Sequence, residues 1–139
     1  MKINYSLLII SGLLLSLCAC KKDNNAPGSI TGRWSVISDS TFVGVGINNH
    51  PVAYHGQPGD YFDFRTDGKV YTKEGAALDT MAYDLVSDTS IIIAAFGITL
   101  NGVPETSHIK IFTADRLIIK APVIATPGGI FGRTISLSR

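Results

Sequence analysis

The sequence predicts an all-β domain built from antiparallel hairpins in up-and-down order, either a small barrel of about eight strands or a sandwich. Three observations carry this prediction. Beyond Ile30, short apolar runs alternate with polar residues at the period of a strand, turn signals separate the runs, and no stretch shows a clean helical stripe. One domain is the natural count for this length.

Eight segments have a strand-like pattern, and they lie at 34–38, 61–65, 69–73, 80–86, 90–95, 107–112, 116–120 and 133–138. The second and third form the clearest hairpin. Phe62 and Phe64 share one face, Asp67-Gly68 is a tight-turn signal, and Val70 returns on the partner strand.

The apolar face of these strands is the expected core. Alternation places on it Trp34, Val36, Phe62, Phe64, Val70, Met81, Tyr83, Leu85, Ile109, Ile111 and Ile135. In the first strand the same face continues to Ser38. Two runs, 91–93 and 117–119, are apolar on both faces, so we expect the loop 96–104 or a partner protein to cover their outer side.

The segment 41–61 is rich in glycine and fits the strand pattern less well. One interpretation extends the first strand, turns at Asn48–Pro51 and adds a short strand at Val52–His55. The other makes the segment a loop over the mouth of a barrel. The sequence leaves both open.

The N-terminus has the features of a secretory leader. Lys2 precedes an apolar stretch from Leu7 to Leu17, which is too short to span a bilayer. Cleavage before Cys20 would leave the small residue Ala19 at the cut, so "LCAC" resembles a bacterial lipobox with Cys20 as the lipidated residue. We therefore expect a signal peptide at 1–19, a lipidated cysteine and polar linker at 20–29, and a folded domain at 30–139.

This resemblance implies acyl chains such as palmitate on Cys20 and a membrane as the first partner of the chain. Lys21 replaces the aspartate that favours inner-membrane retention, so the expected location is the outer membrane, facing the periplasm or the cell surface. Cys18 leaves with the leader. The remaining domain must then fold without a disulfide.

Charge and polar residues argue against several function classes. Once Lys2 leaves with the leader, basic and acidic side chains balance at 11 each, so we expect no nucleic acid partner. We interpret the three histidines as solvated side chains and not as a metal site, and we expect neither metal nor cofactor; they are His50, His55 and His108. Aspartates cluster at turns, where they bond the backbone, while Asp63 and Asp84 are expected to face solvent. We expect no buried carboxylate pair, no catalytic residues and no enzyme activity.

Several segments together resemble the small lipocalin-like domain of bacterial lipoproteins. They are "GRW" at 32–34, "DYFDFRTDGKVYT" at 60–72, "YDLVSDTSIII" at 83–93, "IKIFTADRLIIK" at 109–120 and the closing "ISLSR". The resemblance implies an antiparallel barrel and, for most members, no established activity. This chain lacks the C-terminal helix pattern and the disulfide of secreted lipocalins.

Two functions follow from the predicted barrel. In the first, large side chains line a cup for a small apolar ligand, with Trp34, Tyr54, Phe62, Phe64 and Tyr83 as its contacts and the 41–60 loop at its edge. In the second, these residues fill the barrel as ordinary core, and the protein is an accessory or interaction protein with an envelope protein partner. The volume of the internal cavity distinguishes the two.

Overall fold

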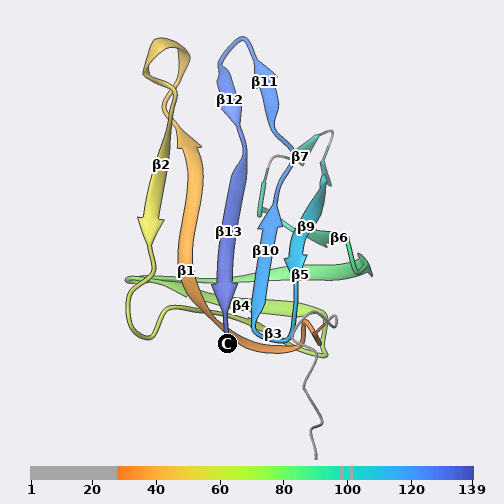
Figure 1. Ribbon diagram of the computed structural model, residues 1–139. Coiled ribbons are helices and arrows are strands. Elements are labelled where there is room, and N and C mark those ends of the chain that lie inside the picture. The colour runs from red at the N-terminus through yellow and green to blue at the C-terminus, as the bar shows by residue number, and fades with distance from the viewer. Residues whose placement is uncertain (1–27, 98, 101) are drawn as a thin grey trace, which may run out of the picture.

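The computed structural model describes residues 28–97, 99–100 and 102–139. The leader, Cys20 and most of the linker lie outside the described residues. Eight strands form a closed antiparallel barrel, in the order β1 (Gly32–Val43), β3 (Tyr61–Phe64), β4 (Lys69–Glu74), β5 (Ala77–Ser87), β6 (Ser90–Ile93), β9 (Thr106–Phe112), β10 (Arg116–Lys120) and β13 (Arg133–Ser138). Pairing of β13 with β1 closes the ring (Figure 1). The prediction of a small up-and-down barrel is confirmed.

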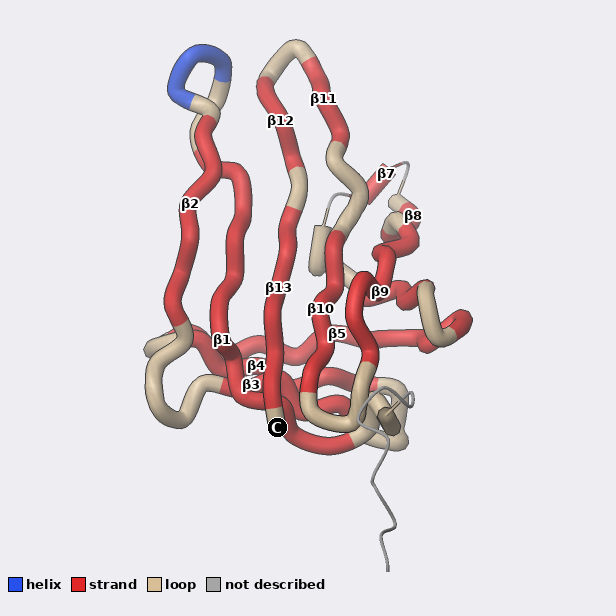
Figure 2. Tube along the Cα trace, in the orientation of Figure 1, coloured by secondary structure: helices blue, strands red, loops and turns tan. Residues whose placement is uncertain are grey.

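Smaller elements extend one end of the barrel. β2 (His50–His55) pairs with the second half of β1, after a short 3-10 turn η2 (Gly46–Asn48). β11 (Ile124–Thr126) and β12 (Gly129–Phe131) form a second hairpin, and β7 (Thr99–Leu100) pairs with β8 (Val103–Pro104). Figure 2 shows the β1–β2 and β11–β12 hairpins projecting side by side beyond the ring. The strand interpretation of 41–61 is therefore confirmed, although the turn falls before Pro51.

The interior of the barrel is filled with apolar side chains over most of its length. The buried hydrophobic residues are Ile30, Trp34, Val36, Phe62, Phe64, Val70, Met81, Ile91, Ile93, Phe96, Ile109, Leu117, Ile119, Ala121, Ile135 and Leu137. Burial of this surface is the main free-energy term that offsets the loss of chain entropy. Tyr83 and Leu85 pack against the core from β5 and are half-buried.

One end of the barrel is sealed by groups from both ends of the domain. The indole N–H of Trp34 donates to the carbonyl of Ile30 at 2.8 Å. The Arg139 guanidinium lies 3.9 Å from the centre of the Trp34 ring and donates to the carbonyls of Ile30 and Thr31. We call this the closed end. The described chain also enters here, because Gly28 lies against the turn that begins at Thr113.

A β-bulge changes the phase of β1. The register against β13 shifts between Val36 and Ser38, so the inward face passes from Val36 to Asp39, not to Ser38 as predicted. Gly56 lies against this bulge: its N–H donates to the carbonyl of Ile37 at 3.0 Å, and an added Cβ would stand 1.9 Å from the oxygen of Val36. Only glycine permits so close an approach of two backbones.

A second bulge corrects another prediction. The register between β9 and β10 shifts between Ile118 and Ile119, where Ile111 faces the former and Ile109 the latter. Ile109 is buried, but Ile111 leaves the core face and Phe112 packs against the core instead. Strict alternation predicts both isoleucines in the core, so the prediction is wrong for Ile111.

The expected cover over the outside of 91–93 differs from what the structure has. Phe96 is only 2% exposed and turns toward the barrel interior, and Gly97 lies against Ala121. The chain reverses at Ala95, whose φ of 58° is in the left-handed region. The described start of the 96–104 loop thus closes over the interior, and Ile92 keeps a partly exposed outer position.

Candidate functional site

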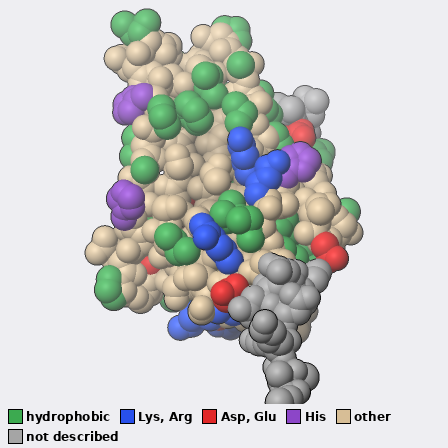
Figure 3. All heavy atoms as spheres, in the orientation of Figure 1, with side chains coloured by type: hydrophobic (Ala, Val, Ile, Leu, Met, Phe, Trp, Pro, Cys, Tyr) green, Lys and Arg blue, Asp and Glu red, His purple; other side chains and the backbone are tan. Residues whose placement is uncertain are grey.

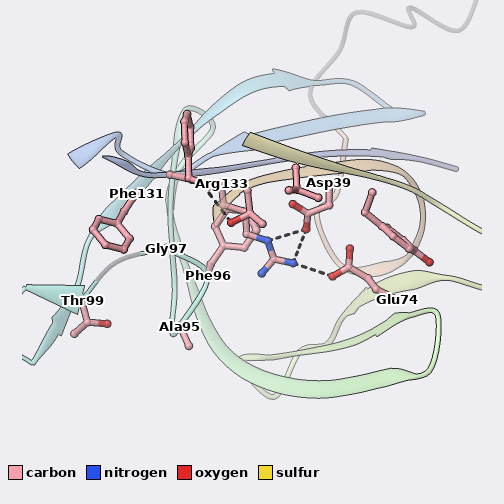
Figure 4. Close-up of a pocket in the computed structure, with 13 residues that line it drawn as sticks. Asp39, Glu74, Ala95, Phe96, Gly97, Thr99, Phe131 and Arg133 are labelled. Atoms are coloured by element: carbon pink, nitrogen blue, oxygen red, sulfur yellow. Dashed lines mark hydrogen bonds and ion pairs between the residues drawn. The ribbon is translucent and has the colours of Figure 1, made fainter. Parts of the chain in front are cut away.

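A pocket of about 640 Å³ occupies the end of the barrel opposite Trp34 and Arg139, which we call the open end. β1 and β2 form one wall, β12 and the start of β13 the next, and residues 95–97 with β7 the third (Figure 4). The pocket is open to solvent at this end of the barrel. Its volume falls within the range of small-molecule sites, about 300 to 1,000 Å³.

Three charged side chains form the floor of this pocket. Arg133 donates from Nε to Asp39 Oδ2 at 2.7 Å and from Nη2 to Glu74 Oε2 at 2.8 Å, and Nη2 also contacts Asp39 Oδ2. The side chains are 19% exposed for Arg133, 7% for Asp39 and 20% for Glu74. Figure 4 shows the guanidinium between the two carboxylates. We call these three residues the charge cluster.

The charge cluster rests directly on the apolar core. The Arg133 guanidinium lies 4.7 Å from the centre of the Phe96 ring and 5.9 Å from that of Phe62. Contacts of this kind stabilise a cation electrostatically. Arg133 thus closes the filled part of the barrel and separates it from the pocket above.

The structure corrects the expectation that no carboxylate pair is buried. Two members of the charge cluster could have been found by alternation: Arg133 is in phase with Ile135 of β13, and Glu74 is in phase with Val70 of β4. Asp39 could not, because only the bulge in β1 brings it to the inward face. A charged residue in phase with the apolar face of its strand is the sequence signal of this cluster.

Two carboxylate oxygens of the cluster are left without a donor. Among the described residues, neither Asp39 Oδ1 nor Glu74 Oε1 has a hydrogen-bond partner, and both atoms are buried. Burial and the nearby charge of Asp39 raise the pKa of Glu74 to about 7, and a hydrogen bond that protonated Glu74 can donate to Asp39 adds to this shift, while the charge of Arg133 opposes it. Glu74 therefore changes its protonation state near neutral pH.

The walls above the charge cluster are largely apolar. Phe42 and Val52 come from the β1–β2 hairpin, Phe131 from β12, and Phe96 from the segment after β6. Val52 and Phe131 are 42% and 36% exposed. A ligand in the pocket would cover them.

Tyr54 adds a polar group to the wall, and a buried aspartate fixes it. The Tyr54 hydroxyl donates to Asp60 Oδ2, and Asp60 also accepts the N–H groups of Gln57 at 2.7 Å and Gly75 at 2.9 Å. The bond to Asp60 raises the pKa of Tyr54 to about 12, and the same bond lowers the pKa of Asp60. Tyr54 therefore stays protonated and held in place at neutral pH.

The five side chains predicted as ligand contacts separate in the structure. Tyr54 lines the pocket. Trp34, Phe62 and Phe64 are 0% exposed and lie in the core beneath it. Tyr83 packs edge-on against Phe64, with ring centres 5.0 Å apart, and its hydroxyl donates to a backbone carbonyl at the outside of the barrel. Apart from Tyr54, the pocket is lined by residues that were not among the five predicted contacts.

Other polar features contribute no further cluster. Asp63 lies beneath Arg33 and Arg65, and Asp84 is exposed. Within residues 28–97, 99–100 and 102–139, no three histidine, cysteine, aspartate or glutamate side chains lie where they could hold a metal ion. In the same residues, no helix has both the length and the apolar character needed to cross a membrane.

Comparisons with protein-family models, with curated proteins and with solved structures found no match. The description of the closed eight-stranded antiparallel barrel and its pocket therefore comes from the sequence and the structure alone.

Proposed function

We propose that this protein is a membrane-anchored lipoprotein whose lipocalin-like barrel binds a small, largely apolar molecule without catalysing a reaction. The observation that carries the proposal is the pocket of about 640 Å³, with exposed Phe131 and Val52 on its walls, above an otherwise filled core. A barrel that served only as a scaffold gains nothing from leaving this volume empty.

The lipocalin-like assignment is supported by the way the two ends of the domain meet. The Gly32-x-Trp34 motif opens β1, and Arg139 of the closing "ISLSR" stacks on Trp34 at the closed end. For the lipid anchor at Cys20, the support remains the lipobox-like sequence, and with it the outer-membrane location.

A non-enzymatic role is supported by the internal pairing of the polar groups. Arg133 is bonded to one oxygen of Asp39 and one of Glu74, the other oxygen of each carboxylate is buried, and the Tyr54 hydroxyl is bonded to Asp60. General acid–base catalysis needs a group free to reach the substrate. We expect no cofactor.

A second function, an interaction protein of the cell envelope, is favoured by the hairpin tips. Val45 is 71% exposed and Ile47 is fully exposed at the tip of the β1–β2 hairpin, and Ile130 is 39% exposed on the neighbouring hairpin. Figure 3 shows hydrophobic side chains gathered over these hairpins. A partner protein could cover them.

A pair of tryptophan substitutions on β2 separates the two functions. Val52→Trp fills the pocket, whereas Ala53→Trp adds the same side chain to the opposite face of this edge strand. The full chain is placed in phosphatidylcholine nanodiscs and titrated with N-phenylnaphthylamine, a neutral dye that fluoresces in apolar sites. Ligand binding predicts uptake by the wild type and Ala53→Trp, and loss of the signal in Val52→Trp. Equal signals from all three would contradict it and favour the interaction function.

A further inference from the structure

We infer that the natural ligand carries a positively charged amino group, which sits over Glu74 and Asp39 while its apolar part contacts the walls. This inference rests on the proposed binding function and names the chemical class of the ligand.

The charge of the pocket lining is unbalanced. Its described residues include two carboxylates, Asp39 and Glu74, against a single cation, Arg133. Asp60, bonded to Tyr54 on the β2 side, adds a further negative charge that acts on Glu74, and Lys73 acts on Asp60 from β4. With Glu74 ionised, the three residues of the charge cluster therefore keep one excess negative charge.

The distribution of hydrogen bonds leads to the same conclusion. Arg133 donates to one oxygen of each carboxylate, and the other two, Asp39 Oδ1 and Glu74 Oε1, have no donor among the described residues. The Asp39 side chain is more than nine-tenths buried, and water cannot reach Oδ1. An acceptor left in this state is unfavourable unless a nearby positive charge or donor compensates it.

An ammonium group on the ligand supplies what the cluster lacks. Glu74 is one-fifth exposed in the pocket and Asp39 lies beneath it. Because both unpaired oxygens are buried, the two carboxylates act on the ammonium through their charge and not through a bond to either of these atoms. The aromatic ring of Phe131, which is 36% exposed in the pocket wall, suits a cation as well as an alkyl chain. An anionic head group would bind less favourably, because the two carboxylates already neutralise the charge of Arg133.

Competition by three amphiphiles of equal chain length tests the inference. Dodecylamine, dodecanol and dodecanoate displace N-phenylnaphthylamine from the full chain in phosphatidylcholine nanodiscs, with Val52→Trp as the background. At pH 8 we expect dodecylamine to bind about tenfold more tightly than dodecanol, and dodecanoate more weakly than either. Glu74→Gln should remove the advantage of the amine, whereas Asp84→Asn, which removes the same charge from the outer face, should preserve it.

A second test measures the binding of dodecylamine and dodecanol to the wild type at different pH values and needs no variant. An alkylammonium stays protonated between pH 6 and 8, as lysine does, but Glu74 gains its charge across this range. The advantage of dodecylamine over dodecanol should therefore grow severalfold from pH 6 to pH 8. Equal affinities of amine and alcohol, or tighter binding of dodecanoate, would overturn the inference and leave the binding function intact. A dye signal that Val52→Trp does not reduce would instead remove the binding function itself.

Discussion

Replacement of Arg133 by methionine tests whether the charge cluster holds the open end of the barrel together. The variant keeps an unbranched side chain of similar length, but it removes the donors to Asp39 and Glu74 at 2.7 and 2.8 Å. Both carboxylates would stay largely buried and lose their only charge partner. Breaking a buried ion pair in this way costs about 3 to 5 kcal/mol.

The lower end of that range applies here, because Glu74 and Arg133 are each about one-fifth exposed and water replaces part of the lost interaction. We expect Arg133→Met to lower the free energy of unfolding by about 3 kcal/mol at pH 8. The loss should shrink by at least about 1 kcal/mol at pH 5, because the carboxylates can then take up protons and become neutral.

Urea unfolding followed by tryptophan fluorescence measures this change. Trp34 is the single tryptophan of the chain and lies fully buried at the closed end, so its emission reports global unfolding, not a local change near Arg133. Arg33→Met is the matched control: Arg33 is 61% exposed and 3.6 Å from Asp63, and its loss should cost under about 1 kcal/mol. Equal costs for the two variants, or a cost for Arg133→Met that is the same at pH 5 and pH 8, would refute the reasoning.

Three further predictions concern single residues. The folded pKa of Glu74 is raised from 4.5 to about 7, so the folded state binds this proton more tightly than the unfolded state does. The free energy of unfolding should therefore fall by about 1 to 2 kcal/mol as pH rises across that interval. Urea unfolding of Glu74→Gln should show a smaller decrease. Tyr54→Phe removes the main cause of the lowered pKa of Asp60, so a carboxyl NMR titration should show that pKa higher than in the wild type, and an unchanged value would contradict the assignment. Gly56→Ala forces a Cβ against the backbone oxygen of Val36 and should cost more than about 2 kcal/mol in thermal unfolding.

Much of the fold was predictable because β-strand alternation is a local property. The hairpin that contains Phe62, Phe64 and Val70 shows its period and its turn within a few residues, and Gly68 adopts the left-handed φ of 75° that the turn requires. Bulges are different. The bulge in β1 depends on contact with Gly56, which is about twenty residues away along the chain, so the residues around the bulge do not predict it.

The same contrast explains the candidate site. Arg133 and Glu74 lie on the inward faces that their strands' alternation defines, so their positions were implicit in the sequence. Asp39 reaches its partner only through the bulge. Alternation correctly placed Trp34, Phe62 and Phe64 on the inward face, but it does not say how deep in the barrel a side chain lies. Depth follows from the stagger of the strands, which only the closed sheet fixes.

The entry of the chain at the closed end bears on how a ligand would travel. Gly28 lies beside the turn at Thr113, at the end sealed by Trp34 and Arg139, and the pocket lies at the other end. With an anchor at Cys20, a linker that reaches at most about 30 Å would join the domain at its sealed end and leave the mouth of the pocket unobstructed by the tether. Such a protein need not draw its cargo out of its own leaflet. An open mouth far from the anchor would also let it exchange cargo with soluble molecules, or with a donor or acceptor in the aqueous space.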